Sequence, residues 1–280
     1  PDYVVAFARV HERAGFDMAL VGYTSSSAEG FLVALHAAGH TERMGYLVAH
    51  RPGFVAPTLM ARKVATFDRL TRGRVALHVI TGKTDREQEG DGDFTPKAAR
   101  YQRAQEYLHL MKRTWREETP FDFDGRFYKV RGAQSDVYPV QSPYPQLLFG
   151  GASEGALAMG AEHCDTYAMY AEPLAAARAR IAEFRARAAA FDRHPGFNIS
   201  VRPILGRTEG EAWDRARGIL ASVATLVPLR CGRRKKPRLG LGVPRPGVGE
   251  VHALEAPDAR VERGGIAGTP VRAGDGGDPR

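Results

Sequence analysis

The chain has 280 residues, with 40 Lys and Arg against 32 Asp and Glu, and a formal net charge of +8. Its only two cysteines, Cys164 and Cys231, are too few for a disulfide framework. The sequence contains no recognisable signal peptide and no apolar run of membrane-spanning length, so we expect a soluble, cytoplasmic protein with no membrane partner.

Strands and helices are predicted to alternate along residues 1–227. The predicted helices cover residues 3–14, 29–38, 57–72, 98–115, 154–162, 173–191 and 209–226. The predicted strands cover residues 16–22, 44–49, 75–80, 146–149, 165–170 and 197–205. This alternation predicts an α/β protein, which we interpret as a TIM (β/α)8-type barrel of about six βα units, incomplete at both ends. An open doubly wound sheet is the alternative, but no GxGxxG turn opens a helix.

The clearest unit runs from residue 50 to residue 82. Pro57 suits the first turn of a helix and Gly73 suits its C-terminal stop. The apolar run that follows is typical of a strand that is covered on both faces. Thr81 and Gly82 come at its carboxyl end, where ligands bind in parallel sheets and barrels.

Two segments interrupt the alternation. Residues 83–96 are polar and acidic, and they are too long for a routine connection, which indicates a functional loop. Residues 121–145 alternate around Asp124 and Gly125, which predicts a hairpin laid against the barrel. We interpret both as insertions rather than domains.

Residues 228–280 form a second region with a different composition. They contain 11 Gly and 7 Pro, while all 25 aromatic residues lie before them, so we expect a disordered tail. A shifted reading frame would produce the same change. The tail has 11 Lys and Arg against 6 Asp and Glu, so it holds +5 of the net charge and leaves only +3 for residues 1–227. That weak charge argues against nucleic-acid binding by the barrel.

Several segments, in this order along the chain, resemble the luciferase-like flavin-dependent monooxygenases, and most of all the alkanesulfonate and sulfone monooxygenases. They are RPGFVAPTLMARKVATFDRLTRGR (51–74), HVITG (78–82), EGDGDF (89–94), ARYQRAQEY (99–107) and PQLLFGGASEGA (145–156). The resemblance implies a barrel that binds reduced FMN (FMNH2), which a separate NAD(P)H-dependent flavin reductase supplies. It implies reaction with O2 to a peroxyflavin that cleaves a C–S bond of a small organosulfur compound. It also implies a homo-oligomer and no metal.

The same resemblance implies cofactor-binding residues. The turn from Gly150 through Gly151 and Ala152 to Ser153 opens a helix, where N–H groups and a hydroxyl can hold a phosphate. A plain turn with Ser153 as the helix cap is the alternative. Tyr101 is implied to lie against the flavin, or is an ordinary surface residue.

His78 and Thr81 are implied to lie near the flavin ring. They are three residues apart, so on one regular strand they would face opposite sides unless a bulge intervened. For His78, a buried histidine bonded to a carbonyl is the alternative.

Three residues are candidates for the reaction itself. Ser27 stands where alkanesulfonate monooxygenases usually have a cysteine, which leaves the substrate open. Arg51 could pair with an anionic sulfonate, because a guanidinium forms bidentate contacts with such oxygens, or it could bridge loops. Arg202 is expected on the last strand, where relatives have a histidine, and could stabilise an anion.

Two other hypotheses stay open. The same barrel could use the deazaflavin F420 for hydride transfer instead of reduced FMN. The chain could also be an inactive, truncated relative, because a sheet of about six strands would have two exposed edges.

Overall fold

The computed structural model describes residues 2–82 and 84–226. Backbone contacts divide the chain into two units, residues 1–205 and 206–280, and each is described by itself. The second unit contributes helix α8 (Glu209–Leu226). The expected tail, residues 228–280, lies outside the described residues. No helix in the described part combines the length and the hydropathy that a membrane crossing requires.

The first unit alternates strands with helices as the sequence predicts. Its strands are β1 (Met18–Val21), β2 (Gly45–His50), β3 (Val75–Val79), β4 (Phe121–Asp124), β5 (Lys129–Ala133), β6 (Leu147–Gly150), β7 (Thr166–Tyr170) and β8 (Gly196–Ser200). Its helices are α1 (Asp2–Arg13), α2 (Gly30–Ala38), α3 (Pro57–Thr71), α4 (Asp85–Gly90), α5 (Lys97–Arg116), α6 (Glu154–His163) and α7 (Leu174–Ala189).

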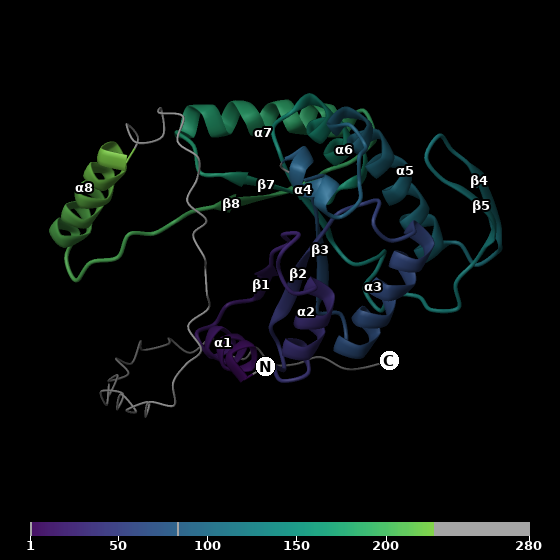
Figure 1. Cartoon of the computed structure of the whole chain (residues 1–280), viewed down its shortest axis with the longest axis horizontal. Coiled ribbons are helices and arrows are strands. Elements are labelled where there is room, and N and C mark those ends of the chain that lie inside the picture. The colour runs from purple at the N-terminus through teal and green to yellow at the C-terminus, as the bar shows by residue number, and fades with distance from the viewer. Residues whose placement is uncertain (1, 83, 227–280) are drawn as a thin grey trace, which may run out of the picture. The chain divides into compact units, whose positions relative to one another are not determined.

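Six strands form one parallel sheet in the order β1-β2-β3-β6-β7-β8. The helices α3, α5, α6 and α7 follow one another around the outside of this curved sheet (Figure 1). Within the described residues, β1 and β8 each pair with one neighbour, so the strands form part of a barrel wall. The predicted α/β fold, an incomplete TIM-type barrel of about six βα units, is confirmed.

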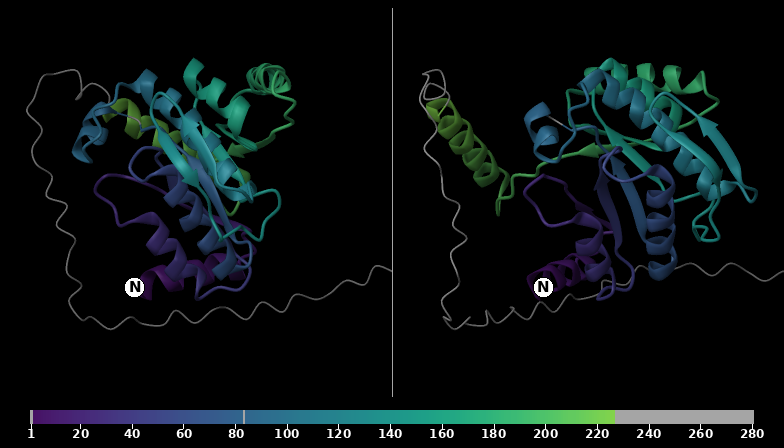
Figure 2. Two further views of the ribbon diagram at one scale, coloured as in Figure 1. Left: turned by 90° about the vertical axis from the view of Figure 1, so that its right-hand side faces the viewer. Right: turned by 45° about the vertical axis from the view of Figure 1, so that its right-hand side comes forward.

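The remaining two strands, β4 and β5, form the predicted hairpin. It is antiparallel and stands beside α5 (Figure 1, Figure 2). Glu106 of α5 fixes the turn, because its carboxylate accepts hydrogen bonds from the backbone N–H groups of Arg126 at 2.9 Å and Phe127 at 2.8 Å.

The core lies between the sheet and the helices. In the central strands β2, β3, β6 and β7 every second residue points outward, and these residues are buried against the helices. An aromatic cluster fills the region under α7: Phe184 lies 5.3 Å from Phe149 and 4.7 Å from Tyr167, measured between ring centroids, and it also contacts Phe197. This cluster joins three strands to one helix.

Two predicted boundaries were wrong. The last strand was expected to run to residue 205, but β8 ends at Ser200, and residues 201–205, which include Pro203, are exposed. The polar segment 83–96 was expected to be a loop, but it contains α4. Helix propensity did not reveal this short helix, because Asp and Gly at its ends are weak helix formers.

The segment after α4 is clamped to α5 by an ion pair. Arg103 donates to both carboxylate oxygens of Asp93, at 3.1 and 2.5 Å, and to the carbonyl of Pro52 at 3.2 Å. Burial by itself raises the pKa of Asp93, but the hydrogen bonds from Arg103 and Thr95 outweigh it and hold the pKa at about 2. The carboxylate is therefore charged in the folded protein at neutral pH.

Replacement of Phe184 by alanine is expected to lower the free energy of unfolding by about 3–5 kcal/mol, because it opens a cavity among packed rings. Phe184 is 1% exposed, while Leu174 on the same helix is 78% exposed and provides the matched control. Urea unfolding of Phe184→Ala and Leu174→Ala measures the difference. Equal stability of the two variants would contradict the packing described.

Replacement of Asp93 by asparagine is expected to cost about 2–3 kcal/mol at pH 7, from the difference between a pKa near 4 in the unfolded chain and about 2 in the folded one. A carboxyl group whose pKa is lowered on folding stabilises the folded state at pH values above its pKa in the unfolded chain. This stabilisation is lost as the pH falls toward 2. The difference between wild type and Asp93→Asn should therefore shrink between about pH 5 and pH 2. Asp124→Asn, at an exposed pair with Arg131, is the control and should cost less than about 1 kcal/mol. If the difference in free energy of unfolding between wild type and Asp93→Asn did not change with pH, the ion-pair explanation would be contradicted.

Candidate flavin-binding cleft

A cleft of about 1180 Å³ lies along the inner face of the sheet. Its wall is built by the inward-facing residues of the strands, which recur at every second position. The inward-facing strand residues are Met18, Leu20, Leu47, His78, Leu148, Gly150, Thr166, Ala168, Tyr170, Gly196, Asn198 and Ser200, and Tyr167, Met169 and Phe197 also contribute to the lining. The sheet therefore separates two environments: a packed core on the helix side and an open, largely apolar cleft on the other.

The turn from β6 to α6 closes one end of this cleft. Gly151 has φ +147°, and a Cβ atom there would lie 2.9 Å from the Cβ of Ala156, so only glycine fits without strain. Ser153 caps α6 by accepting a hydrogen bond from the N–H of Ala156 at 3.4 Å. The first N–H groups of a helix have no partners inside it, so the turn offers donors to an anion.

Tyr101 joins this turn from α5. Its hydroxyl lies 3.1 Å from Ser153 Oγ, which donates to it. Gly155 in the first turn of α6 packs on the tyrosine ring, and a Cβ atom at this position would lie 2.8 Å from Cδ2 of that ring. The structure thus brings together Tyr101, Gly151, Ala152 and Ser153, and all four line the cleft.

His78 and Thr81 also line the cleft. The expectation that they face opposite sides assumed one regular strand, but β3 ends at Val79, before Thr81. Burial lowers the pKa of His78, which keeps the imidazole neutral. Its Nδ1 is buried without a hydrogen-bond partner in the described part of the chain. The alternative considered for His78 was a buried histidine that bonds to a neighbouring carbonyl. Its Nδ1 makes no such bond to a described residue.

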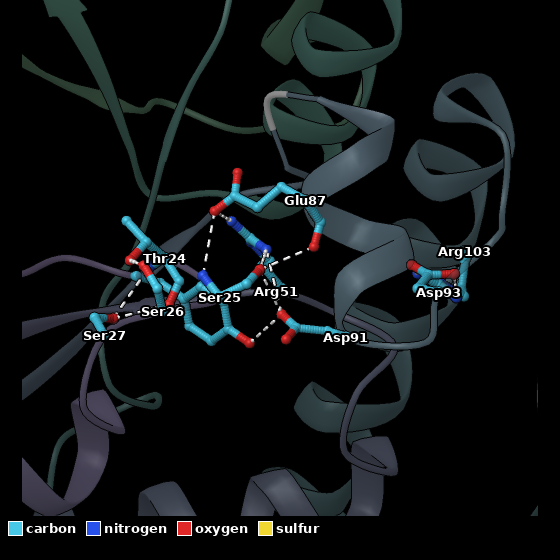
Figure 3. A network of polar contacts seen from close by, with 10 residues as sticks. Thr24, Ser25, Ser26, Ser27, Arg51, Glu87, Asp91, Asp93 and Arg103 are labelled. Carbon is cyan, nitrogen blue, oxygen red and sulfur yellow. Dashed lines mark hydrogen bonds and ion pairs between the residues drawn. The ribbon is translucent and has the colours of Figure 1, made fainter. Parts of the chain in front are cut away.

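Arg51 lies at the centre of a polar network that joins β2, α4 and the loop after β1 (Figure 3). Its guanidinium bonds to Glu87 at 2.5 Å and lies 3.7 Å from Asp91. The Tyr23 ring stacks against this guanidinium, and Cζ of Arg51 lies 4.3 Å from the ring centroid. The Tyr23 hydroxyl donates a hydrogen bond to Asp91 at 3.0 Å. Ser25 donates to Asp91 at 2.8 Å. One buried cation is thus surrounded by two carboxylates.

This network bears on the two roles foreseen for Arg51. A guanidinium that two carboxylates already neutralise attracts an additional anion only weakly. The contacts are those of an arginine that bridges loops, although Arg51 also lines the cleft.

Neither Ser27 nor Arg202 lines the cleft, although Ser27 bonds to Thr24, which does. The Ser27 hydroxyl is used within its own turn: it donates to the carbonyl of Thr24 at 2.9 Å and accepts from the N–H of Thr24 at 3.2 Å. Arg202 is exposed and lies beyond β8, so its expected position on the last strand was wrong. The cause is the same early end of β8 at Ser200.

Sequence reasoning missed many of the side chains that line the cleft, among them Tyr23, Glu87 and Lys97 and the paired Glu172 and Arg180. Glu87 lies in the acidic segment that was already singled out, and Lys97 comes one helical turn before Tyr101. Helical spacing from Tyr101 could have identified Lys97. Among the described residues, no three His, Cys, Asp or Glu side chains gather in a way that could hold a metal ion.

Solved structures of similar fold support this architecture. The EDTA monooxygenase EmoA from Chelativorans sp. BNC1 has a TM-score of 0.70 at 20% identity over 80% of this chain and 61% of its own. DmoA from Hyphomicrobium sulfonivorans has a TM-score of 0.68 at 22% identity over 79% of this chain and 57% of its own. This chain thus spans about three fifths of the length of these relatives.

A third similar structure has a different cofactor. It is an F420-dependent secondary alcohol dehydrogenase in complex with an F420-acetone adduct, with a TM-score of 0.62 at 18% identity over 70% of this chain and 63% of its own. At these identities the structures show the fold, whereas the profile of one sequence family, luciferase-like monooxygenase, matches residues 1–275. The chain therefore belongs to the luciferase-like monooxygenase family, a family of flavin-dependent oxidoreductases.

Proposed function

We propose that the protein is an FMN-dependent two-component monooxygenase that acts on a small organosulfur compound. The observation that carries the proposal is the end of the cleft at which the Gly150–Ser153 turn, the start of α6 and the Tyr101 hydroxyl converge. A separate flavin reductase would supply the reduced flavin, and O2 would be the second substrate.

The residues present fit FMN. The phosphate would be held by N–H groups at the start of α6, by Ser153 and by Tyr101, and Gly151 leaves room for it because it has no Cβ. The flavin ring would lie beside His78 and Thr81, and the unused hydrogen-bonding capacity of His78 supports a polar ligand there. When bound in its reduced form, FMN supplies the two electrons that reduce O2 during oxygen transfer.

The chain's own residues would control the surroundings of that chemistry. His78 is held neutral by burial, so it can donate or accept a hydrogen bond without adding a charge next to the ring. Leu47, Ile80 and Leu148 give the cleft an apolar wall that excludes water from one side.

Between the two organosulfur classes, the charges in the cleft favour an uncharged sulfone over an alkanesulfonate. Arg51, the cation foreseen for a sulfonate, already has Glu87 and Asp91 as partners. With a dialkyl sulfone, one oxygen atom of O2 would be added to a carbon atom bonded to sulfur, and the other would be released as water. Cleavage of the C–S bond would then yield a sulfinate and an aldehyde.

The second candidate is an F420-dependent oxidoreductase. It is favoured by the similarity to the F420-dependent alcohol dehydrogenase and by a neutral His78 in the cleft, which is compatible with either flavin.

The two candidates predict different products. With reduced FMN from a flavin reductase, O2 and a dialkyl sulfone, we expect sulfinate in proportion to the flavin oxidised, and less turnover with an alkanesulfonate. Chromatography of sulfinate and a colorimetric assay for sulfite measure both. Reduction of oxidised F420 by a secondary alcohol, with no oxygenated product from FMN, would instead support the second candidate.

Replacement of Ser153 by alanine should weaken FMN binding about tenfold, because one charge-assisted hydrogen bond to phosphate is worth about 1.5 kcal/mol. Ser26→Ala is the matched control, since Ser26 is exposed and does not line the cleft. Quenching of FMN fluorescence on titration gives both dissociation constants. An unchanged constant for Ser153→Ala would argue against this phosphate site.

A further inference from the structure

Lys97 is distinguished by charge from every other residue of the cleft. Five charged side chains line it: Arg51, Glu87, Lys97, Glu172 and Arg180. Arg51 pairs with Glu87 at 2.5 Å, and Arg180 pairs with Glu172 at 2.9 Å. Lys97 makes no ion pair with any described residue. It is therefore the cation that the cleft leaves uncompensated.

Lys97 and the Gly150–Ser153 turn line the same cleft. Lys97 is the first residue of α5, and Tyr101 follows on the same face one turn later. The Lys97 side chain is exposed. The Tyr101 hydroxyl lies 3.1 Å from Ser153 Oγ, so the helical turn that begins with Lys97 adjoins this end of the cleft.

The start of α5 is an unfavourable place for a lysine in the absence of an anion. The N-terminus of a helix carries a partial positive charge, which disfavours cations in the first turn. The first turn of α5 contains no acidic residue that could offset Lys97. Glu154, at the start of α6, is engaged by Arg187 in a bidentate pair at 2.6 and 2.9 Å. An added phosphate would be the compensating charge that these two helix ends lack.

We propose that Lys97 is a phosphate-binding residue that makes the cleft select a phosphorylated flavin over an unphosphorylated one. The inference rests on the proposed function, because it assumes that the flavin phosphate lies at the Gly150–Ser153 turn. Lys97 would add a cation to the neutral hydroxyl and N–H donors of that turn. The cleft would then distinguish flavins by the charge of the phosphate and not by the ring.

The test compares two probes that differ only in the phosphate, oxidised FMN and riboflavin. We expect Lys97→Gln to weaken FMN binding about threefold, as one exposed ionic contact should. Riboflavin binding should change by less than about twofold. Added salt should weaken FMN binding to the wild type more steeply than to Lys97→Gln, because screening acts on the charge that the variant lacks. Fluorescence titration gives each dissociation constant without any turnover.

Two further variants guard against indirect effects. Arg116→Gln removes a positive charge from the opposite end of the same helix and should leave the ratio of FMN to riboflavin affinity unchanged. Lys97→Arg retains the charge and should retain most of the FMN affinity. Far-UV circular dichroism and the melting temperature establish that each variant is folded.

The outcomes separate this inference from the proposed function. If the wild type binds FMN and Lys97→Gln binds it equally well, the role of Lys97 is refuted while the flavin site stands. If wild type binds riboflavin as tightly as FMN, no phosphate is recognised and the inference fails. If neither probe binds, both the inference and the proposed function fail.

Discussion

The structure depends on a single constraint, the two-residue period of six parallel strands whose two faces meet different surroundings. Outward positions such as Leu77, Phe149 and Tyr167 must fill a helix-covered core, while their neighbours His78, Gly150 and Ala168 must leave room for a cleft. A register shift of one residue would exchange the two sets. The large aromatic side chains of the core would then fill the cleft, and the polar and small residues would lie under the helices.

The charged side chains that join separate segments of the cleft are each paired with an opposite charge nearby. Arg51 is buried, and an unpaired cation there would be costly, so Glu87 and Asp91 do more than hold α4 in place. The same pairing removes most of the attraction that Arg51 could exert on a charged substrate. Specificity in this region would thus depend on shape and apolar contact more than on charge.

Much of this architecture could be predicted from the amino-acid sequence. The helix from Pro57 and the strand from Val75 were correct because their boundaries are set by local chemistry: the fixed φ of proline, the freedom of Gly73 and a short apolar run. The Gly150–Ser153 turn was identifiable for the same reason, since it combines glycines with a helix cap.

The errors had two different causes. For β8, which ends at Ser200, a local signal was present: Pro203 has no backbone N–H and fits poorly inside a strand, although Val201, Ile204 and Leu205 are apolar. That error placed Arg202 on a strand. The charge state around Arg51 had no local signal, because Glu87 and Asp91 are 36 and 40 positions away along the chain and only folding brings them to it. The roles assigned to Ser27, Arg51 and Arg202 remain predictions.

Helix α5 holds three separate parts of the molecule within four residues. Arg100 bonds to Asp85 at 2.9 Å, Tyr101 contacts Ser153, and Arg103 holds Asp93. Because a helix moves as a nearly rigid rod over one turn, these contacts cannot be made or broken independently. The acidic segment and the end of the cleft therefore belong to one cooperative unit, and thermal fluctuations of the segment set a limit on how well defined the cleft can be.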